Sequence, residues 1–529
     1  PCSDGVSPLA NVLERSHTPA SLKQETTRLF NKEERRLAEA IGSLNYTNPF
    51  TPKRLEQERA ILGRNAKSNY AVWHNQDGKR MVNTNISPIF KVCDELVQKL
   101  LSRLPTLKKQ PSEEEMRVFD EMVLYWLFEK HRVPVCELMH EQPQETHYEC
   151  YQAFLEDFNA TIRHPARRQP SEFTPEKTFA VIFQIHRAFY HIFDFIAGGS
   201  LEAAQMRADI WQSIFTYDIY RYHRLLFDRM NNVTTLITGE SGTGKELVAR
   251  AIAFSQYIPF DGKTCCFAQP YADCFKAVQL SAMPQNMIES ELFGHIKGSY
   301  TGAISDHQGY LEICTPHDSI FLDEIGEISV EVQIKLLRVL QNRTFQRLGD
   351  VHPLTFHGKI IAATNQNLHQ AVQNGVFRSD LFYRLCSDSV STVPLRRLIN
   401  GSEEELRQFV MILGRRILGE GREAEQFTDE VCAWIVKNLG LDYSWPGNVR
   451  ELEQCMRNLL IRGTYKPSDS CVAQTSALTA ALRERGLTAD ALMKEYMRVV
   501  FEREGGNLAK TAEAAGVDRR TVRKYLGDE

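Results

Sequence analysis

The sequence predicts a multidomain chain. We expect a mostly α N-terminal region, a parallel α/β domain with a helical lid, and an all-α helix-turn-helix unit at the C-terminus. Three observations carry this prediction. Helical patterns separated by loop-forming segments occupy residues 1–215. From about Asn232, short β-branched runs alternate with helical patterns, which is typical of a parallel sheet covered by helices. Near the end of the chain, two short helical patterns flank a glycine.

Length and composition limit the class of protein. The chain has 529 residues, which is too many for one hydrophobic core and predicts about two to four domains. Hydrophobic residues make up 43% and charged residues 25%, so a mainly disordered, collagen-like or coiled-coil chain is excluded. The formal net charge is −4, so any binding of nucleic acid requires a local basic face.

The cysteine pattern and the hydropathy pattern favour a cytoplasmic protein without a membrane partner. The 12 cysteines are scattered and suggest neither a disulfide framework nor a zinc ribbon. The most apolar stretch, residues 179–197, is interrupted by Arg187 and Asp194 and is not expected to cross a bilayer. Four further residues could in principle form a metal site, namely Cys136, His140, His147 and Cys150. Their spacing fits no established metal-binding template, so packing or surface roles are favoured for them.

The pattern of residues 1–215 predicts a mostly helical region. Ser112 and the glutamates after it form a capping box for a helix that continues through Leu127. Thr174 and Pro175 start another helix. This second helix is rich in aromatic side chains, for which core packing is favoured over a ligand pocket: Phe179, Phe183, Phe189, Tyr190 and Phe193.

A glycine-rich loop follows the first predicted strand of the α/β region, Val233 to Thr238, and opens a helix. In that position glycines allow close approach of the backbone to a phosphate, amides face the anion, and a lysine adds charge. An ordinary glycine turn before a helix is the weaker alternative. Glu246 stands where a general P-loop has Ser or Thr for magnesium. The loop residues are Gly239, Glu240, Ser241, Gly242, Thr243, Gly244 and Lys245.

Two adjacent carboxylates end a second predicted strand, Ser319 to Leu322. Because successive side chains on a strand point in opposite directions, Asp323 can hold magnesium while Glu324 polarises the attacking water. Acid pairs at strand ends are often only solvated. The P-loop upstream makes ATP hydrolysis the better interpretation. A third strand is predicted over Lys359 to Thr364.

The stretch Gly239 to Leu452 resembles the AAA+ domain of the bacterial enhancer-binding proteins that activate sigma-54 RNA polymerase. The loop Gly239–Glu246 matches the family version, including the glutamate at its end. Three further near-literal phrases occur in the family's order, namely Glu289 to His295, Phe321 to Glu327 and Trp445 to Leu452. The resemblance implies an α/β P-loop AAA+ domain with a helical lid.

Two departures from the family pattern concern a contact loop and a switch residue. The segment Gly298, Ser299, Tyr300, Thr301, Gly302 and Ala303 resembles the loop with which the family contacts sigma-54, with Ser299 and Tyr300 in place of Ala and Phe. Glycines on both sides suit a mobile tip that offers one apolar contact. Gln279 occupies the place of an asparagine that restrains the catalytic glutamate, so the resemblance implies that it restrains Glu324.

The resemblance also supplies trans-acting and sensing residues. Residues 377–385 match the segment that provides arginine fingers, so Arg378 and Arg384 would reach the nucleotide bound by a neighbouring subunit. This implies a homo-oligomeric ring with head-to-tail contacts, and a hexamer is expected. Ion pairing at the surface is the ordinary alternative for a single arginine. Thr364 and Asn365 resemble sensor I, and Arg450 resembles sensor II.

The C-terminal segment predicts a helix-turn-helix about Gly516, with Asp518 capping the second helix. Its inward-facing apolar residues are Ala512, Ala515, Val517, Val522 and Leu526. It resembles the Fis-like DNA-binding domain that closes many enhancer-binding proteins. A merely solvated face is the alternative for basic helices. The residues expected to contact double-stranded upstream DNA are Arg519, Arg520, Thr521, Arg523 and Lys524.

Together these features predict a sigma-54-dependent transcriptional regulator that hydrolyses ATP, with Mg²⁺, in a ring to remodel sigma-54 RNA polymerase holoenzyme. The alternatives are an AAA+ ATPase that remodels another protein, and a DNA-binding repressor with a weakened ATPase. The expected boundaries are a regulatory region at 1–215, the α/β ATPase subdomain at 216–392, the helical lid at 393–464, a linker at 465–484 and the DNA-binding unit at 485–529.

Overall fold

The computed structural model describes residues 28–67, 75–76, 79–80, 83–141, 150–167, 170–467, 489–503 and 507–526. The chain divides into two compact units, Pro1–Met456 and Arg457–Glu529, which we describe separately. Among the described residues, no helix combines the length and the apolar composition that a membrane span requires. Most of the predicted linker, from residue 468 onward, lies outside the described residues.

The N-terminal part of the first unit is helical, as predicted, apart from a two-stranded hairpin formed by β1 (Asn75–Gln76) and β2 (Lys79–Arg80). The predicted capping box is confirmed, because the Ser112 hydroxyl accepts from the N–H of Glu115 and the Glu115 carboxylate accepts from the N–H of Ser112. Pro175 opens the second predicted helix. The helices are α1 (Lys32–Ser43), α2 (Pro52–Leu62), α3 (Ile86–Arg103), α4 (Glu113–Lys130), α5 (Arg132–Glu141), α6 (Cys150–Thr161), α7 (Pro175–Phe195), α8 (Leu201–Phe215) and α9 (Ile219–Arg221).

A five-stranded parallel sheet follows, with the strand order β11-β3-β10-β7-β6, which is typical of an AAA+ domain. The three predicted strands are confirmed at its centre as β3 (Thr235–Thr238), β7 (Ser319–Asp323) and β10 (Lys359–Thr364). The edge strands β6 (Phe275–Gln279) and β11 (Asp388–Ser391) were not predicted. Edge strands are half covered and carry polar residues, so they lack the continuous apolar run of a central strand.

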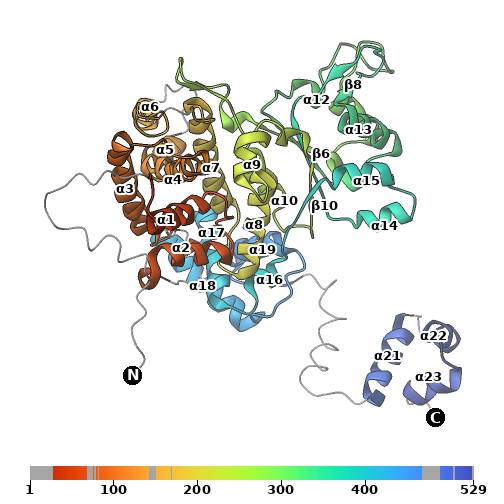
Figure 1. Ribbon diagram of the computed structural model, residues 1–529. Helices are drawn as coiled ribbons and strands as arrows, with labels where there is room; N and C mark the ends of the chain where they lie inside the picture. The colour runs from red at the N-terminus through yellow and green to blue at the C-terminus, as the bar shows by residue number, and fades with distance from the viewer. Residues whose placement is uncertain are drawn as a thin grey trace, which may run out of the picture. The chain divides into compact units, whose positions relative to one another are not determined.

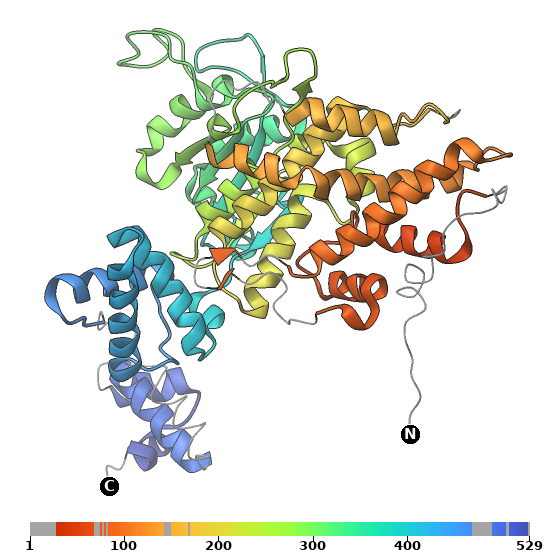
Figure 2. The same cartoon turned by 90° about the vertical axis from the view of Figure 1, so that its left-hand side faces the viewer.

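The two faces of the sheet pack against different helices. One face contributes Leu236, Leu322 and Ile360 to a core shared with the helices on that side. These are α11 (Gln285–Phe293), α12 (Tyr310–Ile313), α13 (Val330–Asn342), α14 (Leu368–Gln373) and α15 (Ser379–Leu385). The other face contributes Ile237 and Ile361 to a core shared with α7, α8 and α10 (Lys245–Ala253). The N-terminal region therefore covers one face of the sheet (Figure 1), and the rotated view agrees (Figure 2).

Helices follow the sheet over the segment for which the helical lid is predicted, from about residue 393. They are α16 (Leu395–Ile399), α17 (Glu403–Leu418), α18 (Arg422–Asn438) and α19 (Asn448–Arg462). Two further hairpins project from the α/β core, β4 (Phe260–Asp261) with β5 (Cys266–Phe267), and β8 (Thr344–Phe345) with β9 (Leu354–Thr355).

In the second unit, the described residues beyond the end of α19 form α21 (Ala489–Arg503), α22 (Leu508–Ala515) and α23 (Arg519–Leu526). Ala512 and Val522 are buried, and Ala515, Val517 and Leu526 pack beside them, as predicted. Gly516 adopts the left-handed conformation between α22 and α23, and the Asp518 carboxylate caps α23 by accepting from the N–H groups of residues 520 and 521. The structure adds α21, whose Met497 completes the core.

Candidate nucleotide-binding site

The P-loop connects β3 to α10 and is fixed by close backbone contacts. A Cβ atom on Gly239 would lie 2.0 Å from the hydroxyl of Thr392, so only glycine fits there. Gly244 adopts the left-handed conformation with φ +88° as the last residue before α10. The Thr243 hydroxyl donates to the Glu240 carbonyl at 2.8 Å and contacts the Thr392 hydroxyl at 2.6 Å. The amides of the loop are thus held at the N-terminus of α10, where an anion is favoured.

Lys245 begins α10, and its side chain is turned back over the loop. Its ammonium donates to the carbonyls of Gly239, at 3.2 Å, and Glu240, at 3.4 Å. The ammonium also lies 3.7 Å from the carboxylate of Glu324. Lys245 is buried. A buried ammonium beside a carboxylate and at the mouth of an amide-lined loop can bind a phosphate with little rearrangement.

Asp323 and Glu324 lie at the carboxyl end of β7, opposite the P-loop. Glu324 has φ 56° and ψ 51°, a left-handed conformation that is uncommon outside glycine and separates its side chain from that of Asp323. The Glu324 carboxylate accepts from the backbone N–H of Asn365 at 3.1 Å. Burial, and then the charge of Glu324, raise the pKa of Asp323. The positive charge of a divalent cation would lower this pKa again, so the carboxylate pair is suited to hold such a cation.

Gln279 and Thr364 end the strands on either side of β7. Gln279 is directly opposite Asp323 in the β6–β7 register and lines the same cleft. Within the described residues, Glu324 is hydrogen bonded to Asn365 and lies near Lys245, and no hydrogen bond joins it to Gln279. Thr364 is buried, and its hydroxyl accepts from the N–H of Gln366 at 3.0 Å, so it supports the end of the strand and does not line the cleft.

The lid contacts the P-loop directly through the start of α19. The Asn448 amide donates to the Glu240 carboxylate at 3.1 Å and to the Ser241 carbonyl at 3.0 Å, and its oxygen accepts from the N–H of Leu395 at 2.9 Å. Glu240 also receives two hydrogen bonds from Arg396, at 2.6 and 2.8 Å, which lower its pKa. The Glu240 side chain, predicted to bind the nucleotide, therefore faces the lid.

Arg450 lies over the loop, where its guanidinium donates to the Ser241 hydroxyl at 3.1 Å. A Cβ atom on Gly242 would lie 2.4 Å from the carbonyl of Gly447, so the loop glycine is also required for contact with the lid. Glu246 points along α10 and pairs with Arg250 at 2.8 Å.

These contacts enclose a cleft of about 310 Å³ between the α/β core and the lid. The predicted residues that line it are Ser241, Gly242, Thr243, Gly244, Lys245, Glu246, Gln279, Asp323, Glu324 and Arg450. The structure adds a wall that sequence reasoning missed, formed by Asp194, Phe195, Ile196, Ala197, Met206, Leu398, Phe409, Ile412, Leu413, Arg416 and Val449. Much of this wall is apolar and can accept a flat heterocycle, while the opposite end is charged. Its segments lie far apart in sequence and form ordinary core patterns, so no local signal marks them.

Arg378 and Arg384 do not line the cleft of their own chain. Arg378 precedes α15, and its guanidinium pairs with Asp380 through hydrogen bonds of 2.7 and 3.1 Å. Arg384, on α15, is exposed. The two arginines thus occupy one short segment on the outside of the chain.

The glycine-bounded loop is an exposed hairpin beyond α11. The N–H of Gly298 donates to the Ala303 carbonyl at 2.9 Å, and the N–H of Ala303 donates to the Tyr300 carbonyl at 3.0 Å. Both loop glycines have positive φ, +82° and +107°, with open space around them, so backbone conformation and not crowding favours glycine. Tyr300 is 48% exposed and Ile304, which sequence reasoning missed, is 84% exposed. Ser299 packs against the neighbouring β8–β9 hairpin at Gly349, and Thr301 is exposed.

The residues predicted to contact DNA lie together on α23 of the second unit. Arg519, Arg520, Arg523 and Lys524 are exposed on α23, whereas Thr521 is half-buried and its hydroxyl donates to Asp518 at 2.9 Å. No group of three or more His, Cys, Asp or Glu suited to a metal ion occurs among the described residues. His147 and the side chain of His140 lie outside them.

Comparison with known proteins places this domain in a family. Residues 221–391 match the family described as the Sigma-54 interaction domain. Nitrogen fixation protein AnfA of Azotobacter vinelandii is 37% identical over 301 residues, covering 55% of this chain and 51% of AnfA. The DNA-binding transcriptional regulator NtrC of Rhizobium meliloti is 32% identical over 358 residues, covering 60% of this chain and 68% of NtrC. A crystal structure of NtrX from Brucella abortus has 24% identity and a TM-score of 0.38, covering 76% of this chain and 85% of that one.

The chain spans about half the length of AnfA and 39% to 62% of several other curated relatives. The matched family segment contains the P-loop, the acidic pair, the glycine-bounded loop and both arginines. The likeness to NtrC continues over two thirds of that regulator. On these grounds, this chain belongs to the family of sigma-54-dependent transcriptional activators.

Proposed function

We propose that the protein binds and hydrolyses ATP in a homo-oligomeric ring and uses the energy to remodel the sigma-54 RNA polymerase holoenzyme at promoters. The observation that carries this proposal is the cleft, where a phosphate-binding loop faces the acidic pair and a lid arginine. The N-terminal helices would serve as the regulatory region 1–215, ahead of the ATPase subdomain 216–392 and the lid 393–464.

Each part of the nucleotide has a matching part of the cleft. The loop amides and Lys245 would bind the β- and γ-phosphates, and Arg450 would approach them from the lid. The apolar wall around Ile196, Phe409 and Leu413 would hold the adenine. Asp323 would hold Mg²⁺, and the ion would neutralise charge on the phosphates.

Glu324 would polarise the water that attacks the γ-phosphorus. In the structure its carboxylate is tied to the N–H of Asn365 and lies near Lys245. When Lys245 turns to the phosphate, Glu324 loses this neighbouring charge and is free to accept a hydrogen bond from water. The Asn365 bond would then report on the nucleotide state at the end of β10. Gln279 lies opposite Asp323 in the strand register and lines the same cleft, where it would restrain Glu324.

Arg378 and Arg384 would complete the site of a neighbouring subunit. Their absence from their own cleft supports a role in trans, and Asp380 would release Arg378 on assembly. A contact of this kind is head-to-tail, so it closes as a ring, and we propose a hexamer.

The exposed loop 298–303 would contact sigma-54 and move with the nucleotide state. Tyr300 and Ile304 supply apolar area at the tip. The α22–α23 pair would bind upstream DNA through the basic residues of α23, with Asp518 and Thr521 fixing the start of that helix. The action on polymerase and DNA would take place in the cytoplasm.

The test compares phosphate release with promoter opening. We expect the purified protein to release phosphate from ATP, Lys245→Ala to abolish release, and Tyr300→Ala to leave release intact while promoter opening by sigma-54 polymerase is lost. Tyr300→Phe is the matched control and should open promoters. Crosslinking from position 300 to a protein other than sigma-54 would favour a different remodelling target, and the absence of phosphate release would contradict the ATPase.

A further inference from the structure

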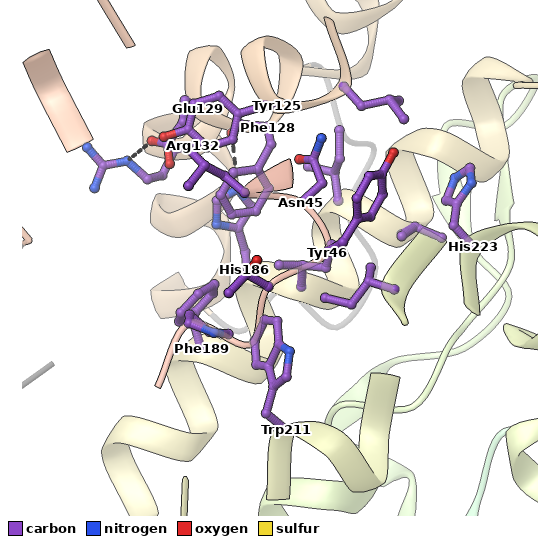
Figure 3. A pocket seen from close by; sticks show the side chains of 18 of the residues that line it. Asn45, Tyr46, Tyr125, Phe128, Glu129, Arg132, His186, Phe189, Trp211 and His223 are labelled. Carbon is purple, nitrogen blue, oxygen red and sulfur yellow. Dashed lines mark hydrogen bonds and ion pairs between the residues drawn. The ribbon is translucent and has the colours of Figure 1, made fainter. Parts of the chain in front are cut away.

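A second cavity, of about 230 Å³, lies within the N-terminal helical region. Its walls come from the turn after α1, from α2, α3, α4, α5, α7, α8 and α9, and from the helical segment after α9. Figure 3 shows side chains from these separate segments converging on it, among them Tyr46, His186, Phe189, Trp211 and His223. Natural cores rarely leave a space of this size, and an apolar cavity of about 150 Å³ is already large enough to bind benzene.

The cavity is lined mainly by aromatic and aliphatic side chains. Phe128, Phe189 and Phe193 form part of the wall, together with aliphatic residues such as Val181 and Ile185. Water gains little in an apolar space of this kind, whereas an aromatic ligand gains contact with several rings. The lining therefore favours a ring-containing molecule.

Four uncharged side chains of the lining present buried polar atoms that have no hydrogen-bond partner among the described residues. They are the hydroxyls of Tyr125 and Thr178, the indole nitrogen of Trp211 and both ring nitrogens of His223. All four side chains are at least nine-tenths buried, with exposures from 1% to 7%. A buried polar atom without a partner carries a cost in free energy of about 1 to 3 kcal/mol. Several of them around one cavity indicate that a ligand supplies the missing partners.

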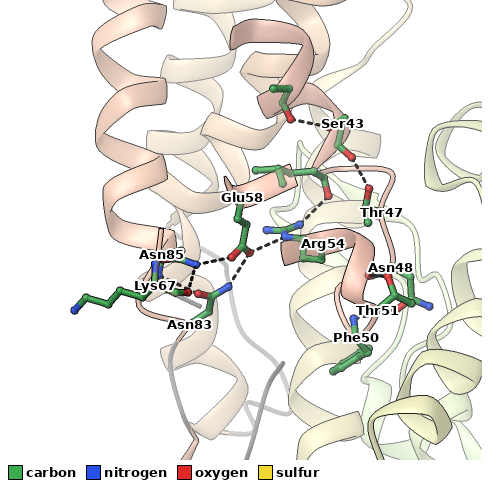
Figure 4. A network of polar contacts seen from close by, with 12 residues as sticks. Ser43, Thr47, Asn48, Phe50, Thr51, Arg54, Glu58, Lys67, Asn83 and Asn85 are labelled. Atoms are coloured by element: carbon green, nitrogen blue, oxygen red, sulfur yellow. Dashed lines mark hydrogen bonds and ion pairs between the residues drawn. The ribbon is translucent and has the colours of Figure 1, made fainter. Parts of the chain in front are cut away.

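The charged groups at the cavity are already neutralised. The Arg54 guanidinium donates to the buried Glu58 carboxylate at 3.0 Å and to the Leu44 carbonyl at 2.9 Å. Figure 4 shows this pair within a network in which Asn83 and Asn85 also donate to Glu58. Elsewhere on the wall, Arg132 pairs with Glu129 at 3.2 Å.

The histidines of the cavity are neutral as well. Burial lowers the pKa of both His186 and His223 to about 3. Above the Glu129 pKa of about 7, each cationic side chain that lines the cavity has its own carboxylate and each imidazole is uncharged, so the described wall offers no unpaired charge to a ligand ion.

We propose that this cavity is a binding site for an uncharged small molecule of one or two fused aromatic rings that carries at least one hydrogen-bonding group. The ring would pack against the phenylalanine side chains. The polar substituent would pair with one or more of Tyr125, Thr178, Trp211 and His223.

The position of the cavity connects it to the nucleotide cleft. Helix α7 lines both spaces, because Phe193 faces the cavity while Asp194 and Phe195, the next two residues, line the cleft. Trp211 of the cavity wall shares a hydrophobic core with Val248 and Ile252 of the P-loop helix. The coupling between the cavity and the cleft rests on the proposed ATPase activity. Occupancy of the cavity changes ATP turnover by shifting α7 and α10.

Binding is tested on the full chain without nucleotide, using naphthalene, 2-naphthol and 2-naphthoate as probes. The three share a ring system and differ in hydrogen bonding and charge. We expect saturable binding of 2-naphthol by equilibrium dialysis, with a matching rise in the unfolding temperature. Naphthalene should bind more weakly and 2-naphthoate should not bind. If no probe binds saturably, or if 2-naphthoate binds as tightly as 2-naphthol, the proposal is overturned.

Matched substitutions locate the site. Thr178→Val and Tyr125→Phe remove unpartnered hydroxyls, and at least one should weaken 2-naphthol binding about two- to tenfold without changing naphthalene binding. The controls are Thr161→Val and Tyr222→Phe, which remove equally buried hydroxyls that bond to Asp157 and Gln184 outside the cavity. Equal affinity of both cavity variants and wild type for 2-naphthol would overturn the assignment.

The coupling is measured separately as ATP turnover with and without saturating 2-naphthol. The coupling is supported if 2-naphthol changes kcat or KM of the wild-type protein. The same concentration should cause no such change in the cavity variant that binds 2-naphthol more weakly. Binding without any change in turnover overturns the coupling and leaves the site intact. Loss of ATP turnover under all conditions contradicts the proposed function and does not affect the binding result.

Discussion

The backbone N–H of Asn365 donates a hydrogen bond to the Glu324 carboxylate across 3.1 Å. This bond joins the end of β10 to the residue after β7, two neighbouring parallel strands. Glu324 adopts the left-handed backbone conformation directly after β7, a conformation uncommon outside glycine, and its carboxylate reaches the end of β10. The residue proposed to polarise water is thereby coupled to the segment proposed to sense the γ-phosphate.

Glu324→Gln should abolish ATP hydrolysis while ATP binding remains. The glutamine oxygen can still accept from the N–H of Asn365, so the local geometry survives, but the amide is a poor base. We expect kcat to fall by about 10²- to 10⁴-fold. Turnover and equilibrium nucleotide binding measure the two effects. Glu327→Gln, an exposed change three residues away, serves as the control, and comparable loss in that variant would contradict the assigned role.

Arg384→Ala should lose hydrolysis as a pure protein and recover it in a mixture with Lys245→Ala. In mixed rings, about a quarter of the interfaces would pair an intact P-loop with an intact arginine. The matched control mixes Lys245→Ala with Glu324→Gln. Both changes damage the same half of the site, so no interface is complete and no recovery is expected. If the first mixture stays as inactive as the second, the arginine does not act in trans.

Asn448→Ala should destabilise the contact between lid and P-loop far more than Arg396→Ala, although both side chains bind Glu240. Asn448 is fully buried, and its loss leaves the Leu395 N–H and the Ser241 carbonyl without partners. We expect a cost of about 2 to 3 kcal/mol in the free energy of unfolding. The Arg396 pair is about two-fifths exposed and should contribute about 0 to 1 kcal/mol. Denaturant unfolding of both variants measures the difference, and equal costs would contradict this ranking.

The buried carboxyl of Glu129 should make the stability of the first unit depend on pH. Burial raises its pKa to about 7, well above the unfolded value of about 4.3, so the folded state binds the extra proton between these pH values. Its contribution to stability is therefore complete below the unfolded pKa and is lost as the pH rises toward 7.

Glu129→Gln keeps the shape without the charge. Its stability relative to wild type should increase from pH 5 to pH 8, by up to about 3 kcal/mol. Urea unfolding at four pH values measures this trend. Glu137→Gln, an exposed change on α5, should show a flat difference, and a flat difference for Glu129→Gln would contradict the prediction.

Local features of the sequence were sufficient to predict the central strands, the P-loop and the caps. Each leaves a pattern of residues close in the chain, although the strands themselves pair with partners that are distant in sequence. Ser112 caps its helix through a residue three positions later, and Asp518 does the same. The strands β3, β7 and β10 are continuous apolar runs because both faces of the sheet are covered.

The aromatic helix shows the limit of such patterns. Phe189, Tyr190 and Phe193 line the cavity, whereas Phe179 and Phe183 pack into the hydrophobic core. All five residues satisfy the same helical periodicity. Which of them faces a cavity depends on how closely the opposing helices approach, and that is set by residues distant in the chain.

The sequence by itself determined which loop has the form of a phosphate-binding site, because its glycines and lysine are spaced locally between a predicted strand and a predicted helix. Only the tertiary structure decided what surrounds that loop. The apolar wall proposed to hold adenine joins the end of α7 to lid helices about two hundred residues later, and the strand pairing brings Glu324 to Asn365. Such contacts depend on packing between elements, whose free energy belongs to the assembled core and to no single segment.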